Sequence, residues 1–140
     1  MSVPEPKRDE GKLEVCEKAR ELCQYTITIT KNQNIFLPDF QTVLIDKINQ
    51  LAIDIHVEVW TANNVLVRSP EHLKYRRRLQ ESAAIKCNTL LALIDLAKPM
   101  FHLSGKRVVF WSKKVIRVRS LIRGWRDSDA ERYKQYRDVG

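Results

Sequence analysis

The chain has 140 residues, of which 44% are apolar and 30% are charged, and it contains only four glycines and five prolines. So few turn-forming residues exclude an all-β sandwich and favour a helical bundle, and no apolar run is long enough to cross a bilayer. The net charge of +8 favours a polyanionic partner, either nucleic acid or an acidic protein surface.

The N-terminal segment and the three cysteines indicate where the protein works. Residues 1–10 contain Pro4, Pro6 and mostly charged side chains, so we expect them to be disordered. They hold no apolar segment of the kind found in secretory signals. Cys16, Cys23 and Cys87 form no CxxC pair and fall on apolar helical stripes, where free cysteines pack as small hydrophobes. A reducing, cytoplasmic location fits this pattern.

Two helices are predicted in the first half of the chain. The first spans residues 11–30, although its end, YTITIT, has the β-branched alternation that also favours a strand. The second spans residues 38–65 and begins with Pro38, which is favourable at a first helical position. Its apolar positions are Phe40, Leu44, Ile45, Ile48, Leu51, Ala52, Ile55, Val59 and Ala62. Because this stripe is wide, the second helix should pack on more than one side.

A third helix is predicted over residues 70–97. Ser69 before Pro70 and Glu71 is the pattern of an N-cap, a first-position proline and an acid in the first turn. Pro99 should end or kink this helix.

The third helix begins with a basic cluster that includes three consecutive arginines, Arg76, Arg77 and Arg78. Three successive positions cover most of the circumference of a helix. At least one of the three should therefore pack or pair with an acid such as Glu81 instead of pointing outward.

The fourth predicted helix, residues 106–126, follows a tight turn at Ser104 and Gly105 and holds eight Lys or Arg and no acid. It therefore carries as much positive charge as the whole chain has in surplus. Lys106, Lys113 and Arg117 fall on the face opposite the apolar stripe. That stripe consists of Val108, Trp111, Val115, Val118, Ile122 and Trp125. The remaining basic residues flank it: Arg107, Lys114, Arg119, Arg123 and Arg126.

Four long helices joined by short connections predict an all-α, up-down-up-down four-helix bundle over residues 11–126, with a C-terminal tail over residues 127–140. The wide second helix and an apolar patch around Phe101 leave surface that can pair with another copy. The chain lacks phosphate-binding glycine loops, HExxH and ExxH motifs, and its three histidines are isolated. We therefore expect no enzymatic activity, no cofactor and no metal site.

Several stretches of residues 34–133 resemble the accessory variability determinant (Avd) proteins of diversity-generating retroelements. These proteins belong to a wider group of four-helix bundles that includes the proteins encoded in intervening sequences of bacterial 23S rRNA genes. The resemblance lies in Phe36 with Phe40, ANN at 62–64, RxxQxxAAI at 77–85, LLALIDLA at 90–97 and WSKKVIxVxSLIRGWRDSD at 111–129. The NAEG-like motif of the ribosomal branch is missing after Ala62, which favours the retroelement branch.

The resemblance implies a homopentameric ring with a basic surface, encoded by a bacterium or a phage. It implies binding to the reverse transcriptase of the retroelement and to its template RNA and cDNA, in support of the mutagenic cDNA synthesis that diversifies a target gene. It supplies no catalytic residues.

We expect the basic residues of the third and fourth helices to contact phosphates. The predicted contact set is Arg76, Arg77, Arg78, Lys106, Arg107, Lys113, Lys114, Arg117, Arg119 and Arg123. Trp111 and Trp125 lie on the core stripe, so no aromatic stacking surface is expected among the basic residues, and charge and shape should dominate binding. The alternative is a protein-interaction module whose basic helix docks an acidic partner. Binding to an anionic membrane is disfavoured because the apolar face of that helix is used by the core.

Overall fold

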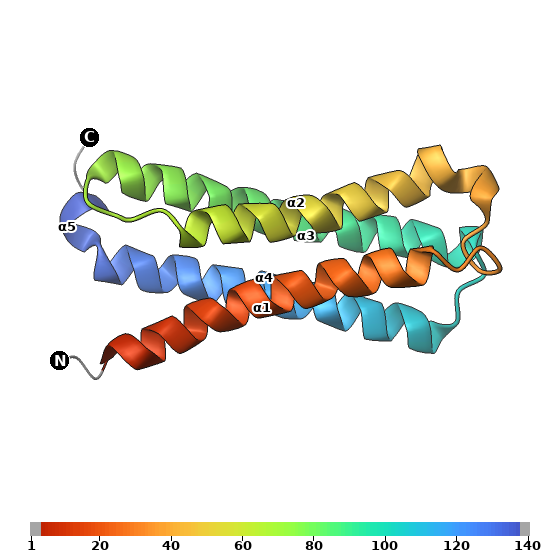
Figure 1. The fold of residues 1–140 in the computed structure, drawn as a ribbon, viewed down its shortest axis with the longest axis horizontal. Coiled ribbons are helices and arrows are strands. Elements are labelled where there is room, and N and C mark those ends of the chain that lie inside the picture. The colour runs from red at the N-terminus through yellow and green to blue at the C-terminus, as the bar shows by residue number, and fades with distance from the viewer. Residues whose placement is uncertain (1–3, 138–140) are drawn as a thin grey trace.

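A computed structural model describes residues 4–137 of the protein, with side-chain surroundings for residues 14–137. This part of the chain holds helices and no strand. The elements are α1 (Pro4–Thr30), the 3-10 turn η1 (Pro38–Phe40), the π-helical segment η2 (Gln41–Ile45), α2 (Asp46–Asn63), α3 (Pro70–Met100), α4 (Gly105–Arg132) and α5 (Lys134–Arg137). The four long helices alternate in direction, and α5 lies at the end where α1 begins (Figure 1). The prediction of an all-α bundle is confirmed for the described residues.

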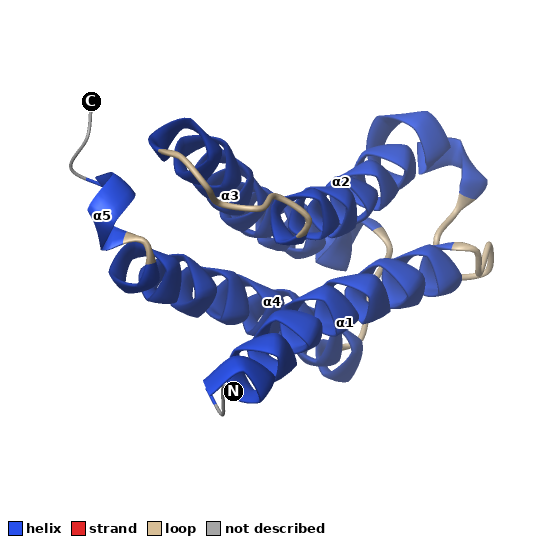
Figure 2. Cartoon of the chain, turned by 60° about the vertical axis from the view of Figure 1, so that its left-hand side comes forward, coloured by secondary structure: helices blue, strands red, loops and turns tan. Residues whose placement is uncertain are grey.

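The long helices form a closed four-membered arrangement. Each packs against its neighbours in the chain, and α1 also packs against α4. Figure 2 shows α2 and α3 lying together on one side of the bundle, with α1 and α4 on the other. The contact between α1 and α4 is the least extensive of the four.

The predicted stripes form the core. Trp111, Val115 and Val118 of α4 are fully buried, and so are Ile48 and Ile55 of α2. Burial of each such large side chain stabilises the fold by about 1.5–3 kcal/mol before entropy losses are counted. The three cysteines are also buried and unpaired, as predicted.

The YTITIT segment is helical, although its side chains also favour a strand. Trp111 Nε1 donates a hydrogen bond to Thr26 Oγ1 over 3.0 Å. Thr30 Oγ1 donates to the carbonyl of Thr26 at 2.9 Å and lies 3.1 Å from Oδ1 of Asn49 on α2. Contacts with two neighbouring helices therefore hold this end of α1 helical and override its local β preference.

The start of the second predicted helix is not regular. Residues 38–45 wind first as the tight η1 and then as the wide η2, and α2 begins only at Asp46. The extra residue in a π turn lets two successive side chains, Leu44 and Ile45, both reach the core. Phe36 anchors the segment, with its ring centroid 5.0 Å from that of Phe101. Phe101 is itself only 4% exposed, so the predicted surface patch around it is an internal contact.

The α3–α4 connection comprises residues 101–104, so Ser104 lies in it as predicted, whereas Gly105 is the first residue of α4. α3 continues to Met100 with Pro99 in its last turn, and His102 adopts the left-handed conformation, with φ 53°. The Leu103 N–H donates to the carbonyl of Lys98 over 2.9 Å, which closes the helix end. Ser104 then caps α4 by accepting a hydrogen bond from the Arg107 N–H.

At the start of α3, the predicted cap is present, because Ser69 Oγ accepts a hydrogen bond from the His72 N–H at 3.2 Å. This contact satisfies one of the backbone donors left free in the first turn.

Two helix boundaries differ from the predictions. α1 begins at Pro4, so residues 4–10, predicted to be disordered, are part of this helix, and residues 1–3 lie outside the described residues. A proline is tolerated there because the first-turn N–H groups have no partner within the helix. α4 runs past the predicted end at residue 126 and stops at Arg132, so the predicted tail begins as helix.

A buried ion pair explains the extra length of α4. Asp129, on the added turn, is 2% exposed, and so is Arg76 at the start of α3. Arg76 Nε donates to Asp129 Oδ2 over 2.7 Å, and Nη2 donates to Oδ1 over 3.0 Å. Gln80 Nε2 donates to the same carboxylate, and Arg76 Nη1 donates to the carbonyl of Val65. The guanidinium lies 5.0 Å from the ring centroid of Trp125.

We expect Asp129→Asn to lower the free energy of unfolding by about 3–5 kcal/mol, because it leaves the Arg76 guanidinium buried without a counter-charge. Urea denaturation monitored by circular dichroism measures the effect. Asp127→Asn, two residues away at an exposed position, is the matched control and should change stability by less than about 0.5 kcal/mol. Equal losses in the two variants would contradict a special role for the buried pair.

Candidate nucleic-acid interface

The structure distributes the ten predicted contact residues over three regions. Arg76, Arg77 and Arg78 lie on the first turns of α3. Arg119 and Arg123 lie on the side of α4 that faces α3. The other five lie along two hollows on the α1 side of α4: Lys106, Arg107, Lys113, Lys114 and Arg117.

The arginine run contributes less than predicted. Arg76 is buried and paired with Asp129, so its guanidinium is withdrawn from solvent and we remove it from the predicted contact set. Arg77 Nε donates to Glu81 over 3.3 Å, and both side chains are about half exposed. Arg78 is exposed. The expectation that at least one arginine of the run packs inside or pairs with an acid is therefore met, because Arg76 is buried and Arg77 pairs with Glu81.

Arg119 and Arg123 belong to the seam between α3 and α4. Arg119 Nη1 donates to Asn88 Oδ1 on α3 over 2.7 Å, and its side chain is partly buried. Both arginines lie near Cys87, a fully buried residue of α3. These two cations are therefore separated by the width of α4 from the cations on the α1 side.

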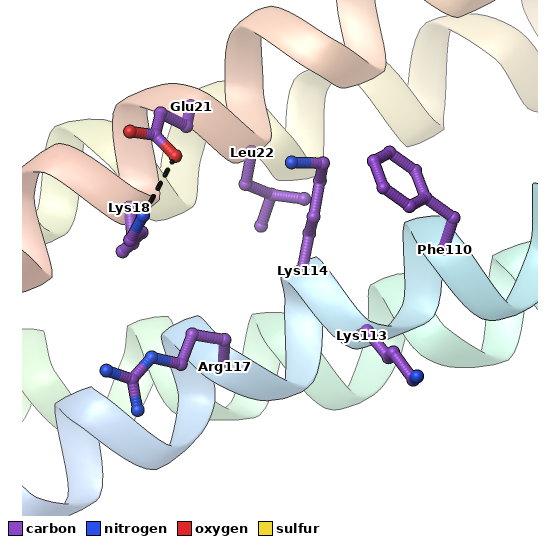
Figure 3. Close-up of a pocket in the computed structure, with 7 residues that line it drawn as sticks. All are labelled: Lys18, Glu21, Leu22, Phe110, Lys113, Lys114 and Arg117. Carbon is purple, nitrogen blue, oxygen red and sulfur yellow. Dashed lines mark hydrogen bonds and ion pairs between the residues drawn. The ribbon is translucent and has the colours of Figure 1, made fainter.

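Three of the five cations on the α1 side line a hollow between α1 and α4, which we call the α1–α4 groove. It encloses about 300 Å³ and is lined by Lys18, Glu21, Leu22, Phe110, Lys113, Lys114 and Arg117 (Figure 3). Figure 3 shows Lys114 rising from α4 toward Leu22, with Phe110 on one side and Arg117 on the other. Leu22 is fully buried and gives the groove an apolar floor.

Two carboxylates balance part of this charge. Glu21 accepts from Lys18 Nζ over 3.3 Å, and Glu14 accepts from Arg117 Nη2 over 2.6 Å. Both pairs are partly exposed to solvent. Exposed pairs of this kind stabilise by at most about 1 kcal/mol, so a phosphate can compete for either cation.

A second hollow, of about 400 Å³, adjoins the first and is lined by Tyr25, Ser104, Lys106, Arg107 and Phe110. Phe110 is the one residue shared by the two linings. Cations from α4 therefore stand on both sides of this ring.

The basic residues are interleaved with aromatic rings, contrary to the prediction. Trp111 and Trp125 are in the core as predicted, but Phe110 points out of the core and is 54% exposed. Its ring centroid lies 5.4 Å from that of Tyr25 in an edge-on arrangement. Lys114 Nζ lies 4.8 Å from the Phe110 centroid. The exposure of Phe110 could have been predicted from its position, because it lies beside the apolar stripe, about 100° around the helix from Trp111.

Within the described residues, no cluster of His, Cys, Asp or Glu is arranged to hold a metal ion. Over the same part of the chain, none of the helices combines the length and apolarity that crossing a bilayer requires.

No protein-family model, curated protein or solved structure matches this chain. The functional assignment therefore depends on the residues themselves and on the motifs given above.

The raised pKa of Cys87 makes the free energy of unfolding depend on pH. Burial raises the pKa of this thiol to about 12, although the charges of Arg119 and Arg123 oppose the shift. Between pH 9 and 12 the folded protein keeps a proton that the unfolded chain has lost, so stability falls by about 1.4 kcal/mol per pH unit. The stability of wild type relative to Cys87→Ala should therefore decline by roughly 1 kcal/mol between about pH 8 and about pH 10. Urea denaturation of both proteins measures it, and a constant difference would contradict the expectation.

Proposed function

We propose that the protein is a non-catalytic, nucleic-acid-binding accessory subunit of the reverse transcriptase of a diversity-generating retroelement. In this role it binds template RNA and cDNA together with the polymerase, in the cytoplasm of a bacterial host, and supports mutagenic cDNA synthesis. The observation that carries the nucleic-acid part is the row of five cations on the α1 side of α4. The retroelement part is supported by the resemblance of residues 34–133, above all residues 111–129.

The charge of α4 supports contact with a polyanion. Lys106 and Lys113 are exposed, and both line the hollows on either side of Phe110. Arg117 is also exposed, and its solvent-accessible pair with Glu14 is weak enough for a phosphate to replace. Cations in this setting release condensed counterions from a nucleic acid on binding, which makes the affinity depend on salt.

Assembly into a homopentameric ring is part of the proposal. Four exposed apolar side chains on α2 and α3 are suited to contact with another copy. They are Val57, Trp60, Ile85 and Leu96, which are 50%, 57%, 63% and 48% exposed. A ring would repeat the α4 cations around one particle, so that modest charge on each subunit adds up to strong binding of a long RNA.

A second candidate function is docking of an acidic protein surface by α4. Val109 and Ile116 favour it, because they are 52% and 41% exposed on the basic helix and offer an apolar contact between the cations. Lys113→Glu with Arg117→Glu separates the two functions. Loss of RNA binding supports the first proposal. Retained RNA binding with lost polymerase association supports the second.

Salt dependence tests phosphate contact directly. We expect the plot of log affinity for single-stranded RNA against log salt to have a clearly negative slope. Lys106→Gln with Lys113→Gln should reduce that slope by about 1.4, because each lost phosphate contact removes roughly 0.7. Lys31→Gln with Lys47→Gln is the matched control, since both lysines are exposed and lie outside the two hollows. A wild-type slope near zero would rule out phosphate contact as the main source of affinity.

The mass of the purified particle tests the assembly. Five copies of the 16.4 kDa chain give a mass of about 82 kDa in sedimentation equilibrium or light scattering. A monomer at all concentrations would contradict both the ring and the family assignment.

A further inference from the structure

We propose that the α1–α4 groove binds an unpaired nucleobase, so that this basic face takes single-stranded nucleic acid in preference to a duplex. The inference rests on the proposed function and deepens it, because it assigns the ligand class of the same face. It is carried by the position of Phe110 between two basic hollows.

Phe110 supplies a stacking surface. Its side chain is 54% exposed although it is large and apolar, and it stands at the rim of a groove whose floor is the fully buried Leu22. Every nucleobase has an apolar π face, and an exposed aromatic ring in a cationic groove is the common way to bind one without sequence preference. Stacking there would remove the exposed apolar surface of Phe110 from water.

The phosphates of the same strand have cations on both sides of the ring. Lys113 and Arg117 lie on the α1–α4 groove side, and Lys106 and Arg107 lie on the side of the second hollow. A strand running along α4 would therefore place a base on Phe110 and its flanking phosphates on these two pairs. This alternation of an aromatic surface with cations is what single-stranded nucleic acid requires.

Lys114 links the two kinds of contact. Its ammonium group lies 4.8 Å from the centroid of Phe110 and 5.3 Å from that of Tyr25, which holds the edge-on ring pair in place. The long, flexible lysine chain can move from the rings to a phosphate when a base arrives. The carboxylate of Glu21, on the α1 side, can accept a hydrogen bond from the amino group of a base.

A duplex would gain less from this arrangement. In a double helix the base faces are stacked on one another, and the protein meets mainly phosphates and sugar hydroxyls. The exposed ring of Phe110 therefore finds no free base face to stack on in a duplex. The cations would still attract the duplex, so a preference between the two ligands is expected, with measurable binding of both.

The test compares a fluorescently labelled oligoadenylate with an RNA duplex of the same length, bound to the full-length protein at matched salt. We expect wild type to prefer the oligoadenylate. Phe110→Leu should weaken oligoadenylate binding by about 5- to 100-fold. It should leave duplex affinity and the salt slope unchanged, because all the cations remain. Phe110→Tyr, which keeps the ring and guards against a folding artefact, should retain most of the preference.

Tyr75→Leu is the matched control, because Tyr75 is an aromatic residue of α3 that is 46% exposed and lines neither hollow. It should leave both affinities unchanged. The inference is overturned if Phe110→Leu binds oligoadenylate like wild type, or weakens both ligands equally. It is also overturned if Phe110→Leu loses only the polymerase, since the groove would then dock protein. If wild type binds neither RNA, the proposed function fails as well.

Discussion

Arg76 and Asp129 lie 53 positions apart in the chain and meet in the interior between α3 and α4. A charge in this environment is tolerated only when its counter-charge and its hydrogen-bond partners are all present. The Val65 carbonyl and the Trp125 ring surround the guanidinium, and Gln80 donates a hydrogen bond to the carboxylate. The pair therefore fixes the end of α4 against the start of α3, and with it the rotation that turns one side of α4 toward α1. The arrangement of cations on that side depends on this anchor.

The local sequence pattern was sufficient to predict features that depend on residues close together in the chain. Apolar spacing gave the four long helices and the burial of Trp111 and Trp125, and the Ser69 cap was visible in its neighbours. Contacts between distant residues were not visible in this way. Asp129 was predicted to lie in the C-terminal tail, because its partner Arg76 lies far away in the chain. The turn before α4 was predicted at Ser104 and Gly105, but it is His102 that adopts the left-handed conformation, and apolar periodicity does not report backbone angles.

The types of residue in the candidate site could be predicted from the sequence, but not which of them share one surface. The basic residues of α4 suggested a single charged face, but the bundle divides them between the two seams that α4 forms with α1 and α3. Arg76, predicted to contact phosphates, is buried, and Phe110, which was not among the predicted surface residues, is exposed. Both changes follow from the rotation of a helix by part of a turn, which decides whether a residue beside the apolar stripe is covered or open. A helical wheel drawn from the sequence does not fix this rotation closely enough to tell which of two neighbouring side chains is covered.

The helical end of α1 has a consequence for the unfolded chain. Residues 25–30 combine one tyrosine with alternating threonine and isoleucine and carry no charge, proline or glycine. Such segments are prone to join edge to edge with copies of themselves as extended strands. In the native bundle the bonds from Trp111 and to Asn49 keep this segment coiled. Docking of α1 against α2 and α4 thus keeps this segment of the folded protein from pairing with other copies as a strand, in addition to completing the core.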